Sequence, residues 1–339
     1  MRAARMVDVG RMECEEVPVP ALGDADPAAD PAADPSCDVV VRSEMASICG
    51  SDLHIVMLGA GVNHRLPCPH GYPGHEGIGE VVESRAPHLP TGTRVLTFPN
   101  VPEAECFSEY QRLGAAYCVP LPTTAVPRAH LLMAQQLGTV VFARRRRPRD
   151  VAGETVAVVG QGSAGLFFTF LLKRAGAARV VVSDLSDARL AMAQEYGADV
   201  CVNAGRDSLA DVVADLTAGR GADYVVEAVG RADTFLSCVD LVRTDGELLW
   251  FGLPSVDDDI PVGFQRFFRK RLRAAAVYGA QDEPGAMSFR QALALIADGR
   301  IDVAPLLSHV FGIDRIGDAM RLAHEPHDAG ALKVSVEFD

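Results

Sequence analysis

The strongest constraint on how this chain can fold is a β-branched run that leads directly into a cluster of glycines. Residues 155–159 read Thr-Val-Ala-Val-Val, a continuous run suited to a strand that is buried on both faces. Residues 160–165 read Gly-Gln-Gly-Ser-Ala-Gly, a complete G-x-G-x-x-G, and a helical stretch follows. A buried strand, a glycine turn and a helix in this order predict a βαβ unit of a parallel, doubly wound α/β sheet.

Each part of the glycine segment has a physical role in binding a dinucleotide. Gly160 permits a tight turn, Gly162 leaves room for the backbone to approach a pyrophosphate, and Gly165 lets helix and strand pack closely. The helix that opens at Ser163 and Ala164 offers unpaired N–H groups and the positive end of its dipole to the phosphates. The segment therefore predicts a dinucleotide site.

The next strand ends in an acidic residue that bears on which dinucleotide binds. This strand spans residues 179–184, and Asp184 at its end would accept hydrogen bonds from the adenosine ribose and repel a 2′-phosphate. The position after Asp184 is Leu185, and the nearest basic residue, Arg189, lies five residues on. We therefore expect NAD rather than NADP, with Arg189 among the cofactor-binding residues. The alternative is a glycine-rich turn and a surface aspartate in some other α/β fold.

The length of the chain and its changing pattern predict two domains. A chain of 339 residues exceeds the size at which one hydrophobic core usually stops growing. Short β segments between turns fill the first part, and strands alternate with helices from about residue 155. We expect a catalytic domain over 1–138, a dinucleotide-binding domain over 139–280, and a return to the first domain over 281–339. Within the second domain, Glu227 and Gly230 follow a later strand and are candidate neighbours of the cofactor.

Composition excludes several classes of protein. The formal net charge of −13 argues against a nucleic acid or an anionic membrane as the main partner. The eight cysteines form no C-x-x-C pair, and no apolar run follows the first residues as in a signal peptide. We expect reduced thiols in a cytoplasmic protein. The longest apolar stretch, residues 156–172, is too short and too interrupted to span a bilayer.

Two segments stand out from this organisation. Residues 24–35 repeat Asp-Pro-Ala-Ala and carry no large apolar side chain, so we interpret them as an exposed loop inserted between strands. Residues 144–147 are four consecutive arginines, which is typical of a nucleic-acid or targeting patch. Because the chain is acidic and these residues lie at the predicted domain junction, we interpret them as a solvated helix end.

A candidate metal site lies in the first domain. Residues 49–54 read Cys-Gly-Ser-Asp-Leu-His, and residues 74–79 read Gly-His-Glu-Gly-Ile-Gly. Cys49, His75 and Glu76 together supply a thiolate, an imidazole and a carboxylate, which are the ligand types of a catalytic zinc. Three protein ligands leave one coordination position open for water or a substrate oxygen. Taken singly, such residues more often belong to a core or a hydrogen-bond network.

These two motifs, followed about 85 residues later by the glycine fingerprint, resemble the zinc-dependent medium-chain dehydrogenase/reductase family, which includes alcohol, sorbitol, threonine and glucose dehydrogenases. The resemblance implies a β-rich, GroES-like catalytic domain beside a Rossmann domain. It implies that Cys49 and His75 are zinc ligands and that Glu76 is a third or exchangeable one. It also implies that Ser51 and His54 form a relay that carries the proton of a bound alcohol outward.

The same resemblance bears on the number of metal ions. In polyol-like branches a further ligand comes from just before the coenzyme domain, where Gln135 is the first candidate and Gln136 the second. The alternative is a surface glutamine pair on a helix. Many relatives also carry a lobe of four cysteines that holds a structural zinc, but Cys106 is the only cysteine between Val95 and Tyr110. A closed site needs four ligands, so we expect one catalytic zinc per chain and no structural zinc.

We therefore expect a zinc- and NAD-dependent oxidoreductase acting on a secondary alcohol or ketone of a polyol, sugar or cyclitol. The lysine-poor, arginine-rich composition indicates a GC-rich genome and brings secondary-metabolite cyclitols into this class. His64, Arg65 and His70 are candidate contacts to a polar or anionic substrate, or ordinary residues of an exposed loop. The resemblance implies a homodimer or homotetramer. Two alternatives stay open: a zinc-free quinone or enone reductase of the same family, and a non-catalytic NAD-binding protein.

Overall fold

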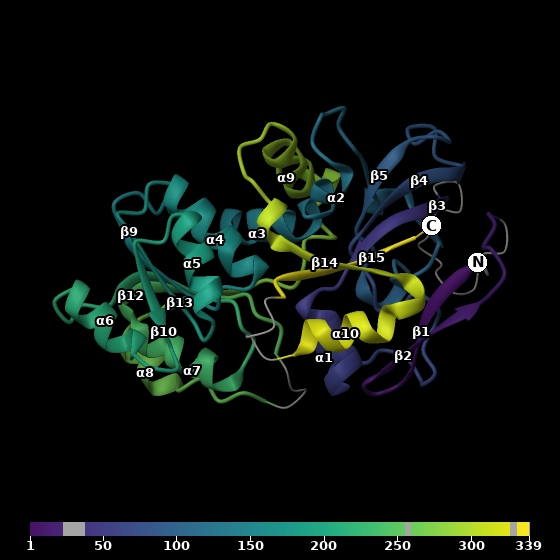
Figure 1. Ribbon diagram of the computed structural model, residues 1–339. Coiled ribbons are helices and arrows are strands. Elements are labelled where there is room, and N and C mark those ends of the chain that lie inside the picture. The colour runs from purple at the N-terminus through teal and green to yellow at the C-terminus, as the bar shows by residue number, and fades with distance from the viewer. Residues whose placement is uncertain (23–37, 255–258, 326–330, 339) are drawn as a thin grey trace. The chain divides into compact units, whose positions relative to one another are not determined.

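The computed structural model describes residues 1–22, 38–254, 259–325 and 331–338. The chain divides into two compact units, one formed by residues 1–139 together with 280–339 and the other by residues 140–279. The repeat over residues 24–35 lies outside the described residues. The first unit is built on an antiparallel-rich sheet and the second on a parallel sheet, which confirms the predicted α/β class (Figure 1).

The second unit is a six-stranded parallel sheet in the order β10-β9-β8-β11-β12-β13. This order corresponds to the doubly wound arrangement 3-2-1-4-5-6, whose switch point lies between the first and fourth strands, here β8 and β11. The strands are Thr155–Val159 (β8), Arg179–Asp184 (β9), Val200–Asn203 (β10), Ala222–Glu227 (β11), Val242–Trp250 (β12) and Arg273–Ala276 (β13).

Burial in this sheet falls from its centre to one edge. Every residue of β8 and of β11 is buried, whereas all four residues of β13 are exposed. Continuous β-branched runs suit the central position, because both faces of such a strand are covered. The helices of this unit are Ser163–Arg174 (α4), Asp187–Glu195 (α5), Leu209–Leu216 (α6), Ala232–Leu241 (α7) and Phe264–Arg269 (α8).

The first unit contains a seven-stranded sheet and a two-stranded hairpin. The larger sheet has the order β14-β15-β3-β4-β5-β7, with β6 paired to β3, and the hairpin joins β1 and β2. These strands are Arg2–Asp8 (β1), Arg11–Glu16 (β2), Asp38–Ser47 (β3), Gly77–Ser84 (β4), Arg94–Thr97 (β5), Tyr110–Gly114 (β6), Cys118–Pro120 (β7), Leu307–Gly312 (β14) and Lys333–Glu337 (β15).

The C-terminal segment completes this sheet. β15 pairs parallel with β14 and antiparallel with β3, so the last strand lies beside a strand from the start of the chain (Figure 1). Strand β3 is therefore covered on both edges, which fixes the residues that follow it. The helices of this unit are Gly50–Leu58 (α1), Arg128–Leu132 (α2), Met287–Ala297 (α9) and Ile316–His324 (α10), and Ala134–Arg145 (α3) crosses into the second unit.

Short 3-10 helices connect these elements, and they are Val101–Glu103 (η2), Ala115–Tyr117 (η3), Pro284–Ala286 (η4), Ala304–Leu306 (η5) and Ile313–Arg315 (η6). Across the described residues, no helix has the length and apolar character needed to cross a membrane.

The arginine run after α3 corrects one prediction. Arg145 and Arg146 are exposed, as expected of a solvated helix end, but the side chain of Arg147 is only 5% exposed. Its guanidinium contacts Glu247 and Glu154, each at 2.7 Å, and lies 4.6 Å from the ring centroid of Tyr224. Arg147 is thus a buried partner for two carboxylates, because burying them unpaired would be costly.

We expect Arg147→Ala to lower the free energy of unfolding of the second unit by about 2–4 kcal/mol, since Glu154 loses its cation and Glu247 keeps the more distant Arg273 and Arg149, at 3.3 and 3.7 Å. Urea unfolding followed by the fluorescence of Trp250, the single tryptophan, measures this unit directly. Arg146→Ala is the control, because Arg146 is exposed and makes only a distant contact with the Phe142 ring. Equal losses in the two variants would contradict the assignment.

Candidate functional site

The first part of the candidate site lies where β3 passes into α1. Cys49 is the N-cap residue of this helix, and its backbone N–H donates to Asp52 Oδ2 at 2.8 Å. Asp52 is completely buried, so it fixes the first turn of the helix from inside. The consequence is a half-exposed thiol held at a rigid helix terminus.

His75 lies just before β4 and is buried. Its Nδ1 contacts Asp52 Oδ1 at 3.0 Å and the carbonyl oxygen of Pro73 at 3.1 Å, while its Nε2 faces Ser51 Oγ at 3.4 Å. A proton on Nδ1 satisfies these acceptors and leaves Nε2 as the nitrogen available to a ligand. Burial lowers the pKa of His75, but the Asp52 carboxylate outweighs it and raises this pKa well above its usual value.

Glu76 is buried beside His75 and belongs to a charged network. Its Oε2 accepts a hydrogen bond from Ser47 Oγ and pairs with Lys333 Nζ at 2.5 Å. Burial opposes ionisation of Glu76, but Lys333 and His75 outweigh it and hold the pKa of Glu76 below its usual value. The other carboxylate oxygen, Oε1, is buried and has no hydrogen-bond partner among the described residues.

The structure brings Cys49, His75 and Glu76 together. One potential ligand atom from each lies within 4.8 Å of the other two, which is close to twice a zinc–ligand distance of about 2.0–2.3 Å. Small side-chain rotations would let one ion contact all three. Oε1 of Glu76, which has no hydrogen-bond partner among the described residues, and Nε2 of His75, which contacts Ser51 Oγ at 3.4 Å, are the atoms that a cation could contact, so these residues fit a zinc ion.

Sequence reasoning missed the residues that support this cluster. Asp52 lies inside the quoted Cys-Gly-Ser-Asp-Leu-His motif, but its role depends on a histidine from another loop. Lys333 and Ser47 come from β15 and β3, and the sequence gives no sign that they meet Glu76. The one available signal is a single lysine within an apolar C-terminal strand, where its side chain is 2% exposed.

The predicted relay residues lie on α1. Ser51 is in the first turn, with its hydroxyl facing His75 Nε2, and His54 follows three residues later. Residues three apart lie on the same face of a helix, so Ser51 and His54 are neighbours along α1. The structure thus places the Ser51 hydroxyl at the candidate metal site and His54 three residues further along the same helix.

The two glutamines at the start of α3 do not hydrogen-bond to the cluster. Gln135 is 3% exposed, and Oε1 of Gln136 is buried without a hydrogen-bond partner in the part of the chain that is described. Both are therefore more buried than a surface pair would be. Adjacent positions on a helix point about 100° apart, so only one of them can face a given ligand.

The candidate substrate residues between the two motifs are largely engaged in local contacts. His64 Nε2 bonds to the carbonyl oxygen of Pro102 at 2.7 Å, and the ring packs edge-on against Tyr72. His70 Nε2 contacts Glu15 Oε2 at 2.9 Å. Arg65 is exposed. The two histidines hold this loop in place, which favours the alternative of ordinary loop residues.

The glycine segment of the second unit has the geometry that a dinucleotide requires. Gly160 has φ +91°, a conformation that favours glycine, and a Cβ at Gly165 would lie 1.9 Å from the carbonyl oxygen of Gly160. At Gly162 a Cβ would meet no atom within 4 Å, so open space lies over the start of α4. No side chain caps that helix, and its first N–H groups, including those of Ser163 and Ala164, are available to an anion.

Asp184 connects the glycine segment to β9. Its Oδ2 accepts from the backbone N–H of Gln161 at 2.7 Å, and its Oδ1 accepts from that of Ser186 at 2.9 Å. Each carboxylate oxygen can accept a second hydrogen bond, so ribose hydroxyls can still bind. Arg189 lies in the first turn of α5, and its N–H donates to Ser186 Oγ.

Glu227 is positioned beneath the loop that follows β11. Its side chain is completely buried, and Oε1 accepts from the N–H groups of Val229 and Gly230 and from Thr234 Oγ1. Gly230 has φ +89°, and a Cβ there would lie 2.0 Å from the carbonyl oxygen of Leu253. Glu227 therefore supports this loop, and its place beside the cofactor stays a prediction.

The remaining described cysteines have low reactivity. Burial raises the pKa of Cys14, Cys68, Cys118, Cys201 and Cys238, and it raises that of Cys106 to about 12. A thiol is unreactive when its pKa is raised in this way. Cys49 is the one cysteine that lies in the cluster.

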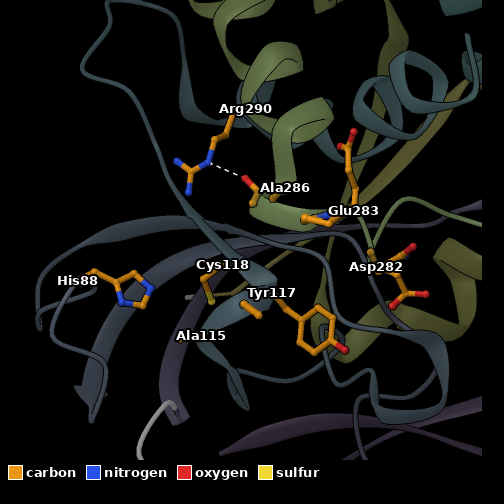
Figure 2. Close-up of a pocket in the computed structure, with 12 residues that line it drawn as sticks. His88, Ala115, Tyr117, Cys118, Asp282, Glu283, Ala286 and Arg290 are labelled. Carbon is orange, nitrogen blue, oxygen red and sulfur yellow. Dashed lines mark hydrogen bonds between the residues drawn. The ribbon is translucent and has the colours of Figure 1, made fainter. Parts of the chain in front are cut away.

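A cavity of about 430 Å³ lies elsewhere in the first unit (Figure 2). It is lined by residues 115–118, 281–286 and 290 together with His88, and it includes none of the residues of the candidate metal site. Arg290 Nε donates to the carbonyl oxygen of Gly285, and Glu283 accepts the N–H of Ser288. Two of its charged side chains thus stabilise the turn before α9. The candidate metal ligands do not line this cavity.

Comparisons with known proteins agree with this arrangement. A zinc-binding dehydrogenase model matches residues 164–298, and an alcohol dehydrogenase GroES-like domain model matches residues 35–129, so together they cover about two thirds of the chain. L-threonine 3-dehydrogenase of Rhizobium rhizogenes is 27% identical over an alignment of 332 residues, which covers 88% of this chain and 88% of the relative.

Two solved structures share the fold over nearly the whole length. L-idonate 5-dehydrogenase from Escherichia coli has a TM-score of 0.81 and 22% identity, covering 99% of this chain and 98% of its own. A structure from Sinorhizobium meliloti 1021 bound to NADP has a TM-score of 0.81 and 22% identity, covering 99% of each chain. The chain belongs to the zinc-type medium-chain dehydrogenase family.

Proposed function

We propose that this oxidoreductase uses one zinc ion and NAD to interconvert a secondary alcohol and its ketone. The observation that carries this proposal is the cluster of Cys49, His75 and Glu76 with the Ser51 hydroxyl 3.4 Å from His75 Nε2. A structural role alone would not require a thiol, an imidazole nitrogen, an unpartnered carboxylate oxygen and a hydroxyl to lie together.

The residues around the cluster have distinct parts in the proposed reaction. Zinc, when bound, would supply a Lewis acid that lowers the pKa of the substrate hydroxyl. Ser51 would accept the hydroxyl proton and pass it along α1 to His54, whose imidazole can take up a proton and release it to solvent. Asp52 and Lys333 would hold His75 and Glu76 in place. Gln135, or Gln136, is the proposed fourth contact, and a neutral amide there would keep the site less anionic than a glutamate would.

The second unit would hold the coenzyme. The space over Gly162 and the uncapped start of α4 accommodate a pyrophosphate, and Asp184 at the end of β9 favours NAD because its carboxylate repels a 2′-phosphate. The solved structure bound to NADP is 22% identical and shows the shared fold only. The proposed preference for NAD therefore rests on Asp184. The hydride would be exchanged with the nicotinamide ring.

The substrate class is proposed from the chemistry of the site and the names of the relatives. Threonine and idonate both carry secondary hydroxyl groups beside other polar groups, so we propose a polyol, sugar or cyclitol. A cyclitol of secondary metabolism belongs to this class. The absence of a four-cysteine lobe between Val95 and Tyr110 supports one zinc per chain.

The direct test is NAD reduction with a panel of polyols, cyclitols, sugars and simple alcohols, with zinc content measured on the same protein. We expect Cys49→Ser to lose zinc and turnover while the dissociation constant for NAD stays within about twofold, because thiolate and coenzyme belong to different units. Turnover retained by Cys49→Ser would contradict the zinc mechanism. Active wild-type protein without zinc would favour the quinone or enone reductase instead, and failure to bind NAD would favour a protein that only keeps the fold.

Asp52 provides a test of the metal site that needs no substrate. We expect Asp52→Asn to weaken zinc binding about 10- to 100-fold, because the carboxylate that orients a ligating histidine contributes this much to metal affinity. Competition with a chelating dye measures the affinity. Asp223→Asn is the matched control, since Asp223 is also buried and accepts a backbone N–H, from Thr155, but lies in the second unit. Unchanged zinc affinity in Asp52→Asn would contradict the proposal that Asp52 supports the metal site.

We also propose that two copies associate through the edge of the parallel sheet. Strand β13 pairs only with β12 among the described strands, and its side chains are all exposed. Nearby in sequence, Phe264, Phe268 and Tyr278 are 68–76% exposed. An unprotected edge beside exposed aromatic residues is typical of a surface that pairs with another chain.

Ala276→Glu tests this association. In a symmetric pairing the substitution places a new negative charge on each copy near the same axis, so we expect a shift from dimer or tetramer toward smaller species. Light scattering after size-exclusion chromatography measures the mass. Val9→Glu introduces the same charge at an exposed site in the first unit and is the control. An unchanged mass in Ala276→Glu would place the interface elsewhere.

A further inference from the structure

The loop that follows β10 is hydrogen-bonded to the end of β9 and to Leu185, beside the proposed adenosine site. Asn203 pairs in register with Asp184, and the N–H of Ala204 donates to the carbonyl oxygen of Asp184 at 3.0 Å. The amide of Asn203 also donates to the carbonyl oxygen of Leu185 at 3.1 Å. Residues 203–206 are therefore neighbours of residues 184–187 at the carboxyl edge of the sheet, where doubly wound folds bind their ligands.

This loop carries a basic residue that the sequence alone did not connect with the site. Arg206 forms a two-pronged ion pair with Asp187, with Nη1 2.8 Å from Oδ2 and Nη2 2.7 Å from Oδ1. Asn203 donates a further hydrogen bond to Asp187 Oδ1 at 2.8 Å. The hydrogen bonds from Arg206 and Asn203 lower the pKa of Asp187 to about 2, so the pair is ionised at neutral pH.

A guanidinium in this position is a natural ligand for a phosphate. Arginine binds phosphate with the same paired N–H groups that it offers to a carboxylate, so one partner excludes the other. Here the paired N–H groups of Arg206 are occupied by Asp187. The negative charge of Asp187 also adds to that of Asp184 beside the proposed ribose position. The exposed fractions of the two side chains, 61% and 65%, show that the pair is not locked by burial.

We propose that Asp187 is a second residue that determines coenzyme specificity, because it holds Arg206 away from the 2′-position of the adenosine ribose. This inference rests on the proposed use of NAD. Under this proposal, Asp184 repels a 2′-phosphate directly. Asp187 pairs with Arg206, the one basic residue among residues 203–207, which could otherwise bind that phosphate. The other charged groups at this edge are Arg189 and Asp207.

The test is a binding titration that requires neither zinc nor substrate. Calorimetry measures the dissociation constants of NAD, NADP and 2′,5′-ADP for the wild type and for Asp187→Asn, which keeps the shape of the side chain. We expect Asp187→Asn to bind NADP and 2′,5′-ADP about three- to tenfold more tightly while NAD changes less than about twofold, as one released charge at an exposed site allows. The gain should shrink at high salt, where exposed charges are screened.

Two further variants show whether Arg206 is responsible. Arg206→Gln in the wild-type background should not tighten the binding of NADP or 2′,5′-ADP, whereas Asp187→Asn combined with Arg206→Gln should keep no more of the gain than Asp207→Asn gives. Asp207→Asn removes an equal charge that does not pair with Arg206, and we expect a smaller gain from it. The proposal is overturned if Asp187→Asn does not tighten NADP binding, including when NADP binds neither protein, or if the double variant keeps the gain. Loss of NAD binding by the wild type would instead overturn the proposed function itself.

Discussion

The site depends on how buried charges in the first unit are balanced. Glu76, His75, Asp52 and Lys333 are all nearly or completely removed from solvent, and each is stable there because an opposite charge lies beside it. Removing one partner of a buried pair costs about 3–5 kcal/mol, because the remaining charge is left uncompensated. The cluster is therefore held as one unit. A cation could contact it at Oε1 of Glu76, which has no hydrogen-bond partner among the described residues, and at Nε2 of His75, which contacts Ser51 Oγ at 3.4 Å.

This balance also explains why the chain returns to its first unit. Lys333 is on β15, Ser47 is at the end of β3, and Glu76 immediately precedes β4. Pairing of β15 with β3 brings the lysine to the carboxylate, so the C-terminal strand contributes to the chemistry as well as to the sheet. In the second unit, the features that suit a dinucleotide are mainly those of the backbone: the open space over Gly162, the turn at Gly160 and the uncapped start of α4, with the Asp184 carboxylate at the end of β9.

Much of this arrangement could be predicted from the sequence, and the reasons for success are local. The predicted ranges 155–159 and 179–184 are those of β8 and β9, because continuous β-branched runs at the centre of a parallel sheet mark their own limits. Other strands are less clearly marked. Strand β12 begins at Val242, and polar Thr244 and Asp245 interrupt its apolar pattern. All four residues of β13 are exposed, so no burial pattern in the sequence marks its limits.

For the site as well, residues in local motifs could be predicted, whereas residues whose partners are distant in the sequence could not. Motifs of adjacent residues identified Cys49, His75 and Glu76, whereas Lys333 could not be found because its partner lies far away along the chain. Arg147 was misread for a similar reason, since its two carboxylate partners come from separate segments. Charge pairs between distant residues are decided by packing, and a single sequence carries little trace of them.

The central claim is that the first unit holds one zinc ion through a mixed set of ligands that includes a single sulfur. X-ray absorption at the zinc edge of the purified protein measures this directly, because sulfur and lighter ligands lie at different distances, about 2.3 Å and about 2.0–2.1 Å. We predict one zinc per chain with one sulfur neighbour and nitrogen or oxygen neighbours for the rest, and loss of the zinc signal in Cys49→Ser. Protein that is active without zinc, or a zinc shell dominated by sulfur, would contradict the account.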